Sequence, residues 1–151
     1  MIWIKDFPLP PSVNEYMFPR KGGGWAKTQK FRDYKQQFLI YKLQNRLILE
    51  NHTKNIKMWR DKGLYLSVDA YFVFHRERLF TKKGFAKKID ANNFLKPLLD
   101  GVSECLDIDD SLFFSGLCEK VSTEKKVDEC TIIKISPHQP RTKENLMATW
   151  S

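Results

Sequence analysis

The sequence predicts an α+β fold in which a small mixed β-sheet is covered by two main α-helices. The chain has 151 residues, which favours one domain, and 42% of them are hydrophobic, enough for a buried core. Residues 64–74 alternate between apolar and polar side chains, as a half-buried strand does, whereas residues 28–50 and 92–106 repeat apolar side chains at helical spacing. The resulting order of strand, loop, helix, strand, helix and two strands is typical of an α+β fold.

The N-terminal third is expected to contain a strand, a loop and a long helix. Residues 2–7 (IWIKDF) predict a short strand, and the prolines that follow it exclude a helix there. Residues 18–27 (FPRKGGGWAK) predict a glycine-rich basic loop or the tip of a hairpin. Thr28 is the expected N-cap of a helix that runs to about residue 50, with a less definite end through residues 51–63. The expected buried face of this helix consists of Phe31, Tyr34, Phe38, Tyr41 and Ile48.

The remaining elements are a long strand, a second helix and two further strands. The core face of strand 64–74 is expected to consist of Leu64, Leu66, Val68, Ala70, Phe72 and Phe74. A mobile basic loop follows over residues 75–88, and the helix over 92–106 has a predicted buried stripe of Leu95, Leu98, Val102 and Cys105 or Leu106. Strands over 112–121 and 128–136, joined by a polar turn, complete the domain. The domain is therefore predicted to span residues 1–136, and residues 137–151 form a polar tail that frays or adds a short element.

Charge and composition narrow the class of partner. The net charge is +8, from 26 Lys and Arg against 18 Asp and Glu, which favours a polyanion such as nucleic acid. No apolar run approaches the ~20 residues of a membrane span, so no membrane partner is expected. The N-terminus lacks the basic segment and long apolar core of a signal peptide. The three cysteines form no zinc or disulfide pattern, which indicates reduced thiols and a cytoplasmic protein.

The sequence does not match the phosphate-loop, calcium-loop or zinc-site motifs. GGGWAKT departs from the phosphate-loop pattern at Lys21 and Ala26. DIDDS departs from the calcium-loop pattern at Leu112 and Cys118. The three histidines are scattered, so the sequence gives no indication of a zinc site.

Residues 87–96 (KKIDANNFLK) gather acidic and amide side chains around one lysine. Either asparagine of this stretch can cap a helix, which would place Pro97 in the tolerant first turn. Capping leaves Lys96 unexplained, because a cation near a helix N-terminus opposes the helix dipole. Residues 107–110 (DIDD) follow the helix, and clustered carboxylates repel one another unless a cation neutralises them. Oxygen ligands without His or Cys suit Mg²⁺ or Mn²⁺, and with a lysine they could hydrolyse a phosphodiester.

These residues resemble a known family. The stretch IDANNFLKPLLDGV, followed by LDIDDSLF and a later EK pair, is similar to the D-x-D-N-x-x-K-x-x-x-D, D-D and lysine pattern of the RusA-type Holliday-junction resolvases. PLPPSVNEY and KTQKFRDYK are also similar to that family, so the resemblance runs from about residue 2 to residue 136. It implies a homodimeric, Mg²⁺-dependent endodeoxyribonuclease, in which Mn²⁺ can substitute. The implied reaction resolves four-way DNA junctions by paired symmetric nicks, in recombination and repair, inside bacterial or phage-infected cells.

The resemblance also implies roles for single residues. The implied catalytic residues are Asp90, Asn92, Lys96 and Asp110, and the implied metal ligands are Asp90, Asn92, Asp109 and Asp110. Asp100 and Lys120 also fall on motif positions. We expect the loops 19–30 and 76–88 to contact DNA, so the candidate DNA-binding residues are Lys27, Lys30, Lys82, Lys83, Lys87, Lys88, Asn93 and Lys120. Phe80 and Phe85 either wedge into the junction centre or pack the second loop against the domain.

Asn92 is the one departure from the family pattern, which has a second aspartate at this position. Asparagine offers one carbonyl oxygen and no charge, so it is a weaker ligand for a hard metal ion. Three explanations remain open: natural variation with Asp107 or Asp109 supplying the charge, an engineered inactivating change, or a protein that binds junctions without cutting them. An RNA-binding or RNA-processing domain is a further alternative.

Overall fold

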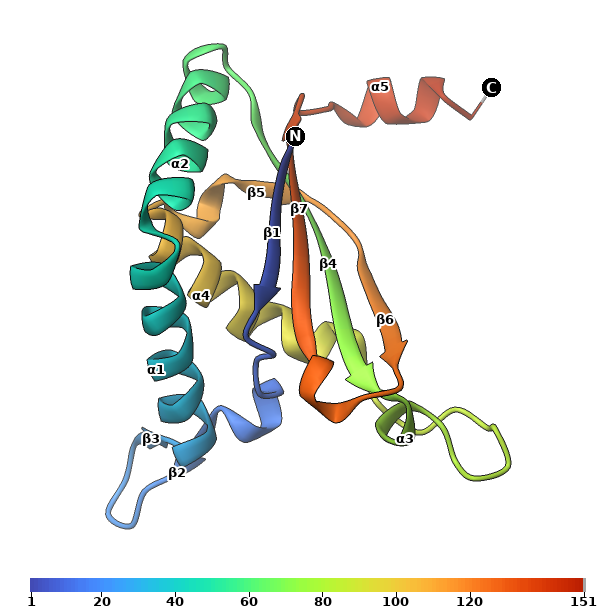
Figure 1. Ribbon diagram of the computed structural model, residues 1–151. Helices are drawn as coiled ribbons and strands as arrows, with labels where there is room; N and C mark the ends of the chain where they lie inside the picture. Colours follow the sequence, from blue (N-terminus) through green and yellow to red (C-terminus); the bar gives the residue numbers. More distant parts are fainter. Residues whose placement is uncertain (151) are drawn as a thin grey trace.

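The computed structural model describes residues 1–150 and contains a five-stranded mixed sheet with helices packed on one face (Figure 1). β1 (Ile2–Phe7) pairs with β7 (Cys130–His138), which pairs in turn with β4 (Tyr65–His75). β5 (Phe113–Ser115) and β6 (Cys118–Thr123) both lie along the other edge of β4. β7 is antiparallel to β1 and β4, whereas β5 and β6 are parallel to β4, so the predicted α+β fold with a mixed sheet is confirmed.

The helical layer consists of α1 (Gln29–Gln44), α2 (Arg46–Asp61) and α4 (Leu95–Leu106). The prediction of one helix to about residue 50 is wrong, because the chain leaves helical geometry at Asn45, whose φ is −114°. The Asn45 side chain donates to the Tyr41 carbonyl oxygen at 2.9 Å, as asparagine does when it competes with the helix backbone. This break changes which side faces the core, so Ile48 is 58% exposed and Leu49 is buried instead.

The predicted start of α1 is confirmed, and the helix packs on α4. The Thr28 side chain accepts a hydrogen bond from the Phe31 backbone N–H. Tyr34 is buried and donates from its hydroxyl to the Pro97 carbonyl oxygen on α4 at 3.1 Å. A Cβ at Gly101 would lie 2.5 Å from that hydroxyl oxygen, so only glycine lets α1 approach this closely.

The core face of β4 is predicted correctly except at its start. Its alternate residues from Leu66 to Phe74 are buried, whereas Leu64 lies before the strand and is half-buried. In α4 the stripe of Leu98, Val102, Cys105 and Leu106 is buried, and Leu95 is half-buried.

The predicted strand over residues 112–121 is divided into β5 and β6 at Gly116. Gly116 has a φ of +155°, and a Cβ there would lie 2.7 Å from the carbonyl carbon of Val68 on β4. The close approach of two backbones requires glycine and interrupts the strand. Farther on, β7 runs two residues past the predicted end at 136, and residues 143–148 form α5 (Lys143–Ala148).

Two excursions leave the sheet and helices at one end of the molecule (Figure 1). One is the hairpin of β2 (Met17–Pro19) and β3 (Trp25–Lys27), whose connecting glycines have positive φ values. The other is the segment after β4, predicted as a loop, which instead begins with α3 (Arg76–Leu79). A bridge between Phe80 and Ala86 then closes the segment into a short loop. None of the helices in residues 1–150 is long and apolar enough to cross a membrane.

Candidate active site and DNA-contact surface

Asp90 caps the short turn that precedes α4. This residue is the N-cap of the 3₁₀ turn η2 (Ala91–Phe94), and its Oδ1 accepts from the Asn92 backbone N–H at 3.0 Å. Asp90 supplies the cap at this helix start, and neither Asn92 nor Asn93 does, because the extended backbone at Asp90 brings its carboxylate over the turn. Pro97 lies in the first turn of α4, as predicted. The Asn92 side chain is exposed and is left without a capping role.

Lys96 lies between two carboxylates. Its Nζ donates to Asp100 Oδ1 at 2.8 Å and lies 3.8 Å from Asp110 Oδ2. The hydrogen bond that Lys96 donates to Asp100 raises the pKa of Lys96, so this amine stays charged at neutral pH. The structure thus joins the helix lysine to the DIDD segment, as the sequence led us to expect. Within residues 1–150, Lys96 forms no ion pair with Asp90.

Tyr16 extends this cluster and was not among the residues predicted from the sequence. Its hydroxyl donates to Asp100 Oδ2 at 2.9 Å, and its ring packs edge-on against Phe31 at 4.4 Å. Burial, together with the bond to Asp100, raises the pKa of Tyr16. The only sequence signal was that Tyr16 ends the PLPPSVNEY stretch, which is similar to the family.

The four residues of DIDD are separated by the fold. Asp107 has a φ of +51°, ends α4 and pairs with Lys42 at 3.1 Å. Asp109 Oδ1 accepts from the Ser111 backbone N–H at 2.8 Å and caps the 3₁₀ turn η3 (Asp110–Leu112), and this bond lowers the pKa of Asp109. Asp110 is the member of the group that reaches Lys96.

Several predicted DNA-binding residues line a cavity with Asp90 or contact the backbone beside it. A shallow cavity of about 520 Å³ is lined by Lys87, Lys88, Ile89, Asp90 and Asn93. Lys120 on β6 donates from its Nζ to the Ile89 carbonyl oxygen at 3.0 Å, so it fixes the backbone next to Asp90. Two of the predicted lysines, Lys87 and Lys88, therefore line the same cavity as Asp90.

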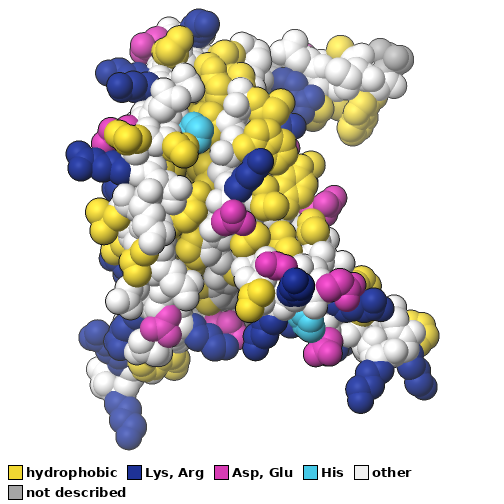
Figure 2. Space-filling view, viewed as in Figure 1, with side chains coloured by type: hydrophobic (Ala, Val, Ile, Leu, Met, Phe, Trp, Pro, Cys, Tyr) yellow, Lys and Arg dark blue, Asp and Glu magenta, His cyan; other side chains and the backbone are white. Residues whose placement is uncertain are grey.

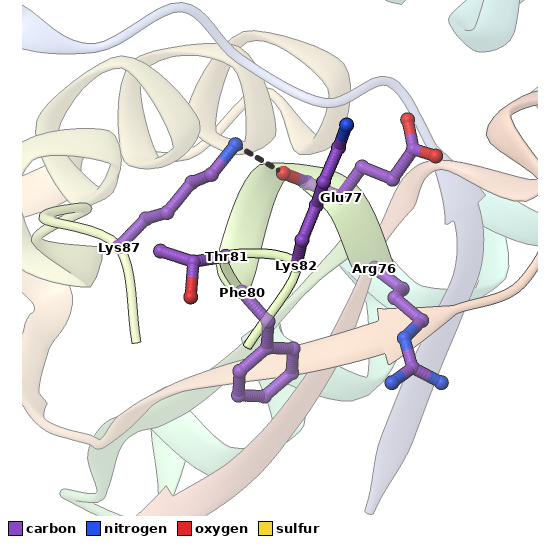
Figure 3. A pocket seen from close by; sticks show the side chains of 6 residues that line it. All are labelled: Arg76, Glu77, Phe80, Thr81, Lys82 and Lys87. Carbon is purple, nitrogen blue, oxygen red and sulfur yellow. Dashed lines mark hydrogen bonds between the residues drawn. The ribbon is translucent and has the colours of Figure 1, made fainter. Parts of the chain in front are cut away.

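The α3 segment forms a second cavity of about 370 Å³ (Figure 3). Lys87 reaches back to the Glu77 carbonyl oxygen at 2.6 Å, and Arg76 and Lys82 lie on the cavity wall. The Phe80 ring also lines this cavity and is 38% exposed.

The tip of this loop is open to a partner. Phe85 is 68% exposed, and Lys82, Lys83 and Lys88 are all exposed. An exposed Phe85 meets the condition on which the wedge interpretation depends. The cavity and the loop tip together give a basic surface with aromatic rings, the combination that nucleic-acid sites use.

The other two predicted lysines lie near the β2–β3 hairpin. Lys30 pairs with Glu15 at 2.9 Å, and the Lys27 amine lies 4.5 Å from the Phe31 ring centroid. The hairpin and the α3 segment leave the same end of the molecule (Figure 1), so the predicted basic residues of the two segments belong to that end.

The donor chemistry of the cluster fits a hard divalent cation. Asp90 and Asp110 offer exposed carboxylates and Asn92 offers a carbonyl oxygen, the oxygen ligands that such cations prefer. Within residues 1–150, no three His, Cys, Asp or Glu side chains form an assembled metal site.

Comparison with known proteins identifies the family. A search of curated proteins found no match. The family described as Endodeoxyribonuclease RusA matches residues 8–136, which include η2, α4, the DIDD segment and Lys120. The match covers most of the 151 residues and supports a Holliday-junction endonuclease in general. The chain therefore belongs to the RusA family of endodeoxyribonucleases.

Proposed function

We propose that this chain is a Mg²⁺-dependent endonuclease, able to use Mn²⁺, that resolves four-way DNA junctions inside the cell by paired symmetric nicks. We further propose that it acts as a homodimer in recombination and repair. The contacts from Tyr16 through Asp100 and Lys96 to Asp110 carry this proposal. They join three segments that are far apart in the sequence around one charged amine, beside the basic cavity at Asp90.

Each residue has a proposed role. Asp90 and Asp110 would hold the cation, helped by Asn92 and Asp109. The cation would activate water and stabilise the charge that develops on the phosphate. Lys96 would hold a phosphate oxygen, and Asp100 and Tyr16 would keep its amine in place. The candidate lysines, with Asn93, would bind the arms of the junction through their phosphates.

The test uses a labelled four-way junction and the purified chain with Mg²⁺, Mn²⁺ or a chelator. Symmetric nicks are expected with either metal and none with the chelator. Asp110→Asn should lower the cleavage rate by about a hundredfold or more, since one charged ligand is lost. Asp61→Asn is the matched control, because Asp61 is an exposed carboxylate at the end of α2 and should leave the rate unchanged. Junction binding without nicks in any metal would rule out the nuclease.

Asn92 supports a second candidate, a structure-selective junction-binding protein with weak or no catalysis. This function predicts salt-sensitive binding of junctions and no metal-dependent loss of substrate. Calorimetry distinguishes the two, because tight Mg²⁺ or Mn²⁺ binding that Asp90→Asn abolishes favours the nuclease. Competition between junction DNA and structured RNA tests whether RNA is the preferred partner.

A further inference from the structure

A guanidinium and an aromatic ring both pack against Tyr65 at the start of β4. Arg60 donates from its Nη1 to the Leu64 carbonyl oxygen at 2.8 Å, and its guanidinium carbon lies 3.9 Å from the Tyr65 ring centroid. The Phe114 ring of β5 lies 4.0 Å from the same centroid, at an interplanar angle of 32°. Contacts of a cation with a ring and of one ring with another are both favourable, so Tyr65 holds Phe114 in place.

Phe114 also lines a cavity that the chain after β7 helps to form. The cavity has a volume of about 260 Å³, and its other walls include His138, Arg141, Lys143 and Leu146. Phe114 is 51% exposed, so part of its ring remains free for a ligand. In Figure 2 the surface is hollowed beneath the projecting C-terminal segment, with Lys or Arg side chains beside the hollow. The volume lies just below the roughly 300 Å³ of the smallest drug-sized pockets, which suits a ligand of about one nucleotide.

The walls of this cavity are basic. Arg141 and Lys143 are exposed, and within residues 1–150 neither forms an ion pair. No Asp or Glu among residues 1–150 lines the cavity. His138 pairs in register with Tyr65 across the strands, so these two side chains lie on the same face of the sheet. Cations without a carboxylate partner, beside an exposed ring, favour an anion that also carries a planar group.

The segment that carries the two cations is anchored at Thr142, which lies between them. The Thr142 side chain accepts from the Asn145 backbone N–H at 3.1 Å, and the Thr142 N–H donates to Asn145 Oδ1 at 3.3 Å. This capping box fixes the start of α5, and Leu146 of α5 reaches the cavity wall. The cations are therefore attached to a defined turn of the chain beside Phe114.

An unpaired nucleotide has the two features that this cavity matches. Its base is planar and can stack on Phe114, and its phosphate is an anion that Arg141 and Lys143 can hold. A base inside a duplex has both faces covered by its neighbours, so only an unpaired base can stack on a protein ring. The net charge of +8 favours a nucleotide that belongs to a polyanion.

The cavity is near the candidate active site along the chain. Phe114 follows Asp110 by four residues, which span at most about 14 Å. That distance corresponds to about four nucleotides of one strand at roughly 3.4 Å each. His138, Arg141 and Lys143 lie outside the family match at 8–136, so the family does not account for this surface.

We propose that this cavity binds an unpaired nucleotide of a DNA strand, with the base stacked on Phe114 and the phosphate held by Arg141 and Lys143. The inference rests on the proposed function, because it takes DNA as the substrate. It extends the substrate class from fully paired junctions to branched DNA that carries a single-stranded flap.

The test measures DNA binding by fluorescence anisotropy in the presence of a chelator, so that no strand is cut. A fully paired four-way junction is compared with the same junction carrying a short oligothymidine flap. The unaltered chain should bind the flapped junction about tenfold more tightly. Phe114→Leu keeps an apolar contact with Tyr65 but has no flat ring, so it should remove this preference and leave the affinity for the paired junction unchanged. Arg141→Gln should reduce both the preference and the salt dependence of flap binding.

Two matched controls separate this site from a general effect of exposed rings and charges. Trp3 stacks on Tyr71 at 6.4 Å and is 43% exposed but does not line the cavity, so Trp3→Leu should leave the preference unchanged. Lys54 is an exposed lysine on α2, and Lys54→Gln should also have no effect. Arg141 is exposed and lies outside the helices and strands, so its replacement tests the site even if Phe114→Leu disturbs the packing on Tyr65.

Several results would overturn the proposal. These are equal affinity for the two junctions, a preference that survives both Phe114→Leu and Arg141→Gln, or tighter binding of a ribonucleotide flap than of the DNA flap. Photoreactive 4-thiothymidine in the flap tests position, because a cross-link is expected in the peptide that contains Phe114. Cross-links confined to residues 76–88 would place the flap on the α3 segment instead. A chain that prefers the flap but cuts no junction would refute the proposed function alone, and one that cuts junctions without preferring the flap would refute only this inference.

Discussion

Replacing Lys96 with methionine should distinguish a catalytic lysine from one that only stabilises the surface of α4. The Lys96 side chain is 62% exposed, and its pair with Asp100 is an i,i+4 surface pair. Such pairs contribute about 0.2–1 kcal/mol, and Asp100 keeps its hydrogen bond from Tyr16 after the change. The free energy of unfolding should therefore fall by less than about 1 kcal/mol. If the amine holds charge on the phosphate, the cleavage rate should fall by about 10²–10³.

The assay compares single-turnover cleavage of a four-way junction with urea unfolding of the same samples. Arg46→Met is the matched control, since Arg46 forms an i,i+4 pair with Glu50 at 3.0 Å and is 75% exposed. This control should show the same small loss of stability and no loss of rate. An unchanged rate in Lys96→Met would refute the catalytic role. If Lys96→Met lowered the free energy of unfolding by more than about 2 kcal/mol, the lost activity would be explained by unfolding.

Three further changes test other parts of the structure. Asn92→Asp should raise the cleavage rate and tighten Mg²⁺ binding, measured by junction cleavage and calorimetry, because it adds a charged oxygen ligand. Gly116→Ala should destabilise the chain by about 3 kcal/mol or more in urea, through the clash with Val68 and the positive φ, whereas Gly84→Ala, with open space around it, should cost about 1 kcal/mol. Burial lowers the pKa of His52 from 6.5, and neither ring nitrogen has a hydrogen-bond partner within residues 1–150. The unfolded chain therefore binds this proton more readily, so stability should fall as the pH drops through about 6.5, and His52→Gln should reduce that fall in urea midpoints across this range.

Periodic patterns predicted the buried scaffold well. The alternation of β4 and the stripe of α4 reflect one dominant interaction, burial of apolar surface, which repeats at a fixed spacing. The helix break at Asn45 was missed because it depends on a side-chain hydrogen bond that competes with the helix backbone. The spacing of apolar residues in the sequence gives almost no sign of that bond. The division at Gly116 was missed because it depends on how closely β4 approaches.

The candidate site was predicted in its residue types but not in its pairing. Asp110 of the DIDD segment lies beside Lys96, whereas Asp90 caps the turn before α4 and forms no ion pair with that lysine within residues 1–150. Sequence alone could not choose the cap among Asp90, Asn92 and Asn93, because Asp and Asn cap helices about equally well. Tyr16 lies 84 positions before Asp100, and such a contact follows from the packing of α1 on α4, which no local pattern encodes.

The charge balance of the cluster gives Asn92 a physical interpretation. Asp100 and Asp110 contact the amine of Lys96, and Asp90 caps the turn that precedes the same helix, so three carboxylates accompany one amine. This leaves two negative charges, the number that one divalent cation neutralises. An aspartate at 92 would leave three, and the free cluster would repel itself more strongly until a cation bound. With asparagine at position 92, the carboxylates of the metal-free cluster repel one another less. The missing negative charge also weakens the affinity of the cluster for the cation. On this reasoning the chain needs a higher Mg²⁺ concentration than its Asn92→Asp variant, and the two rates converge once both sites are saturated.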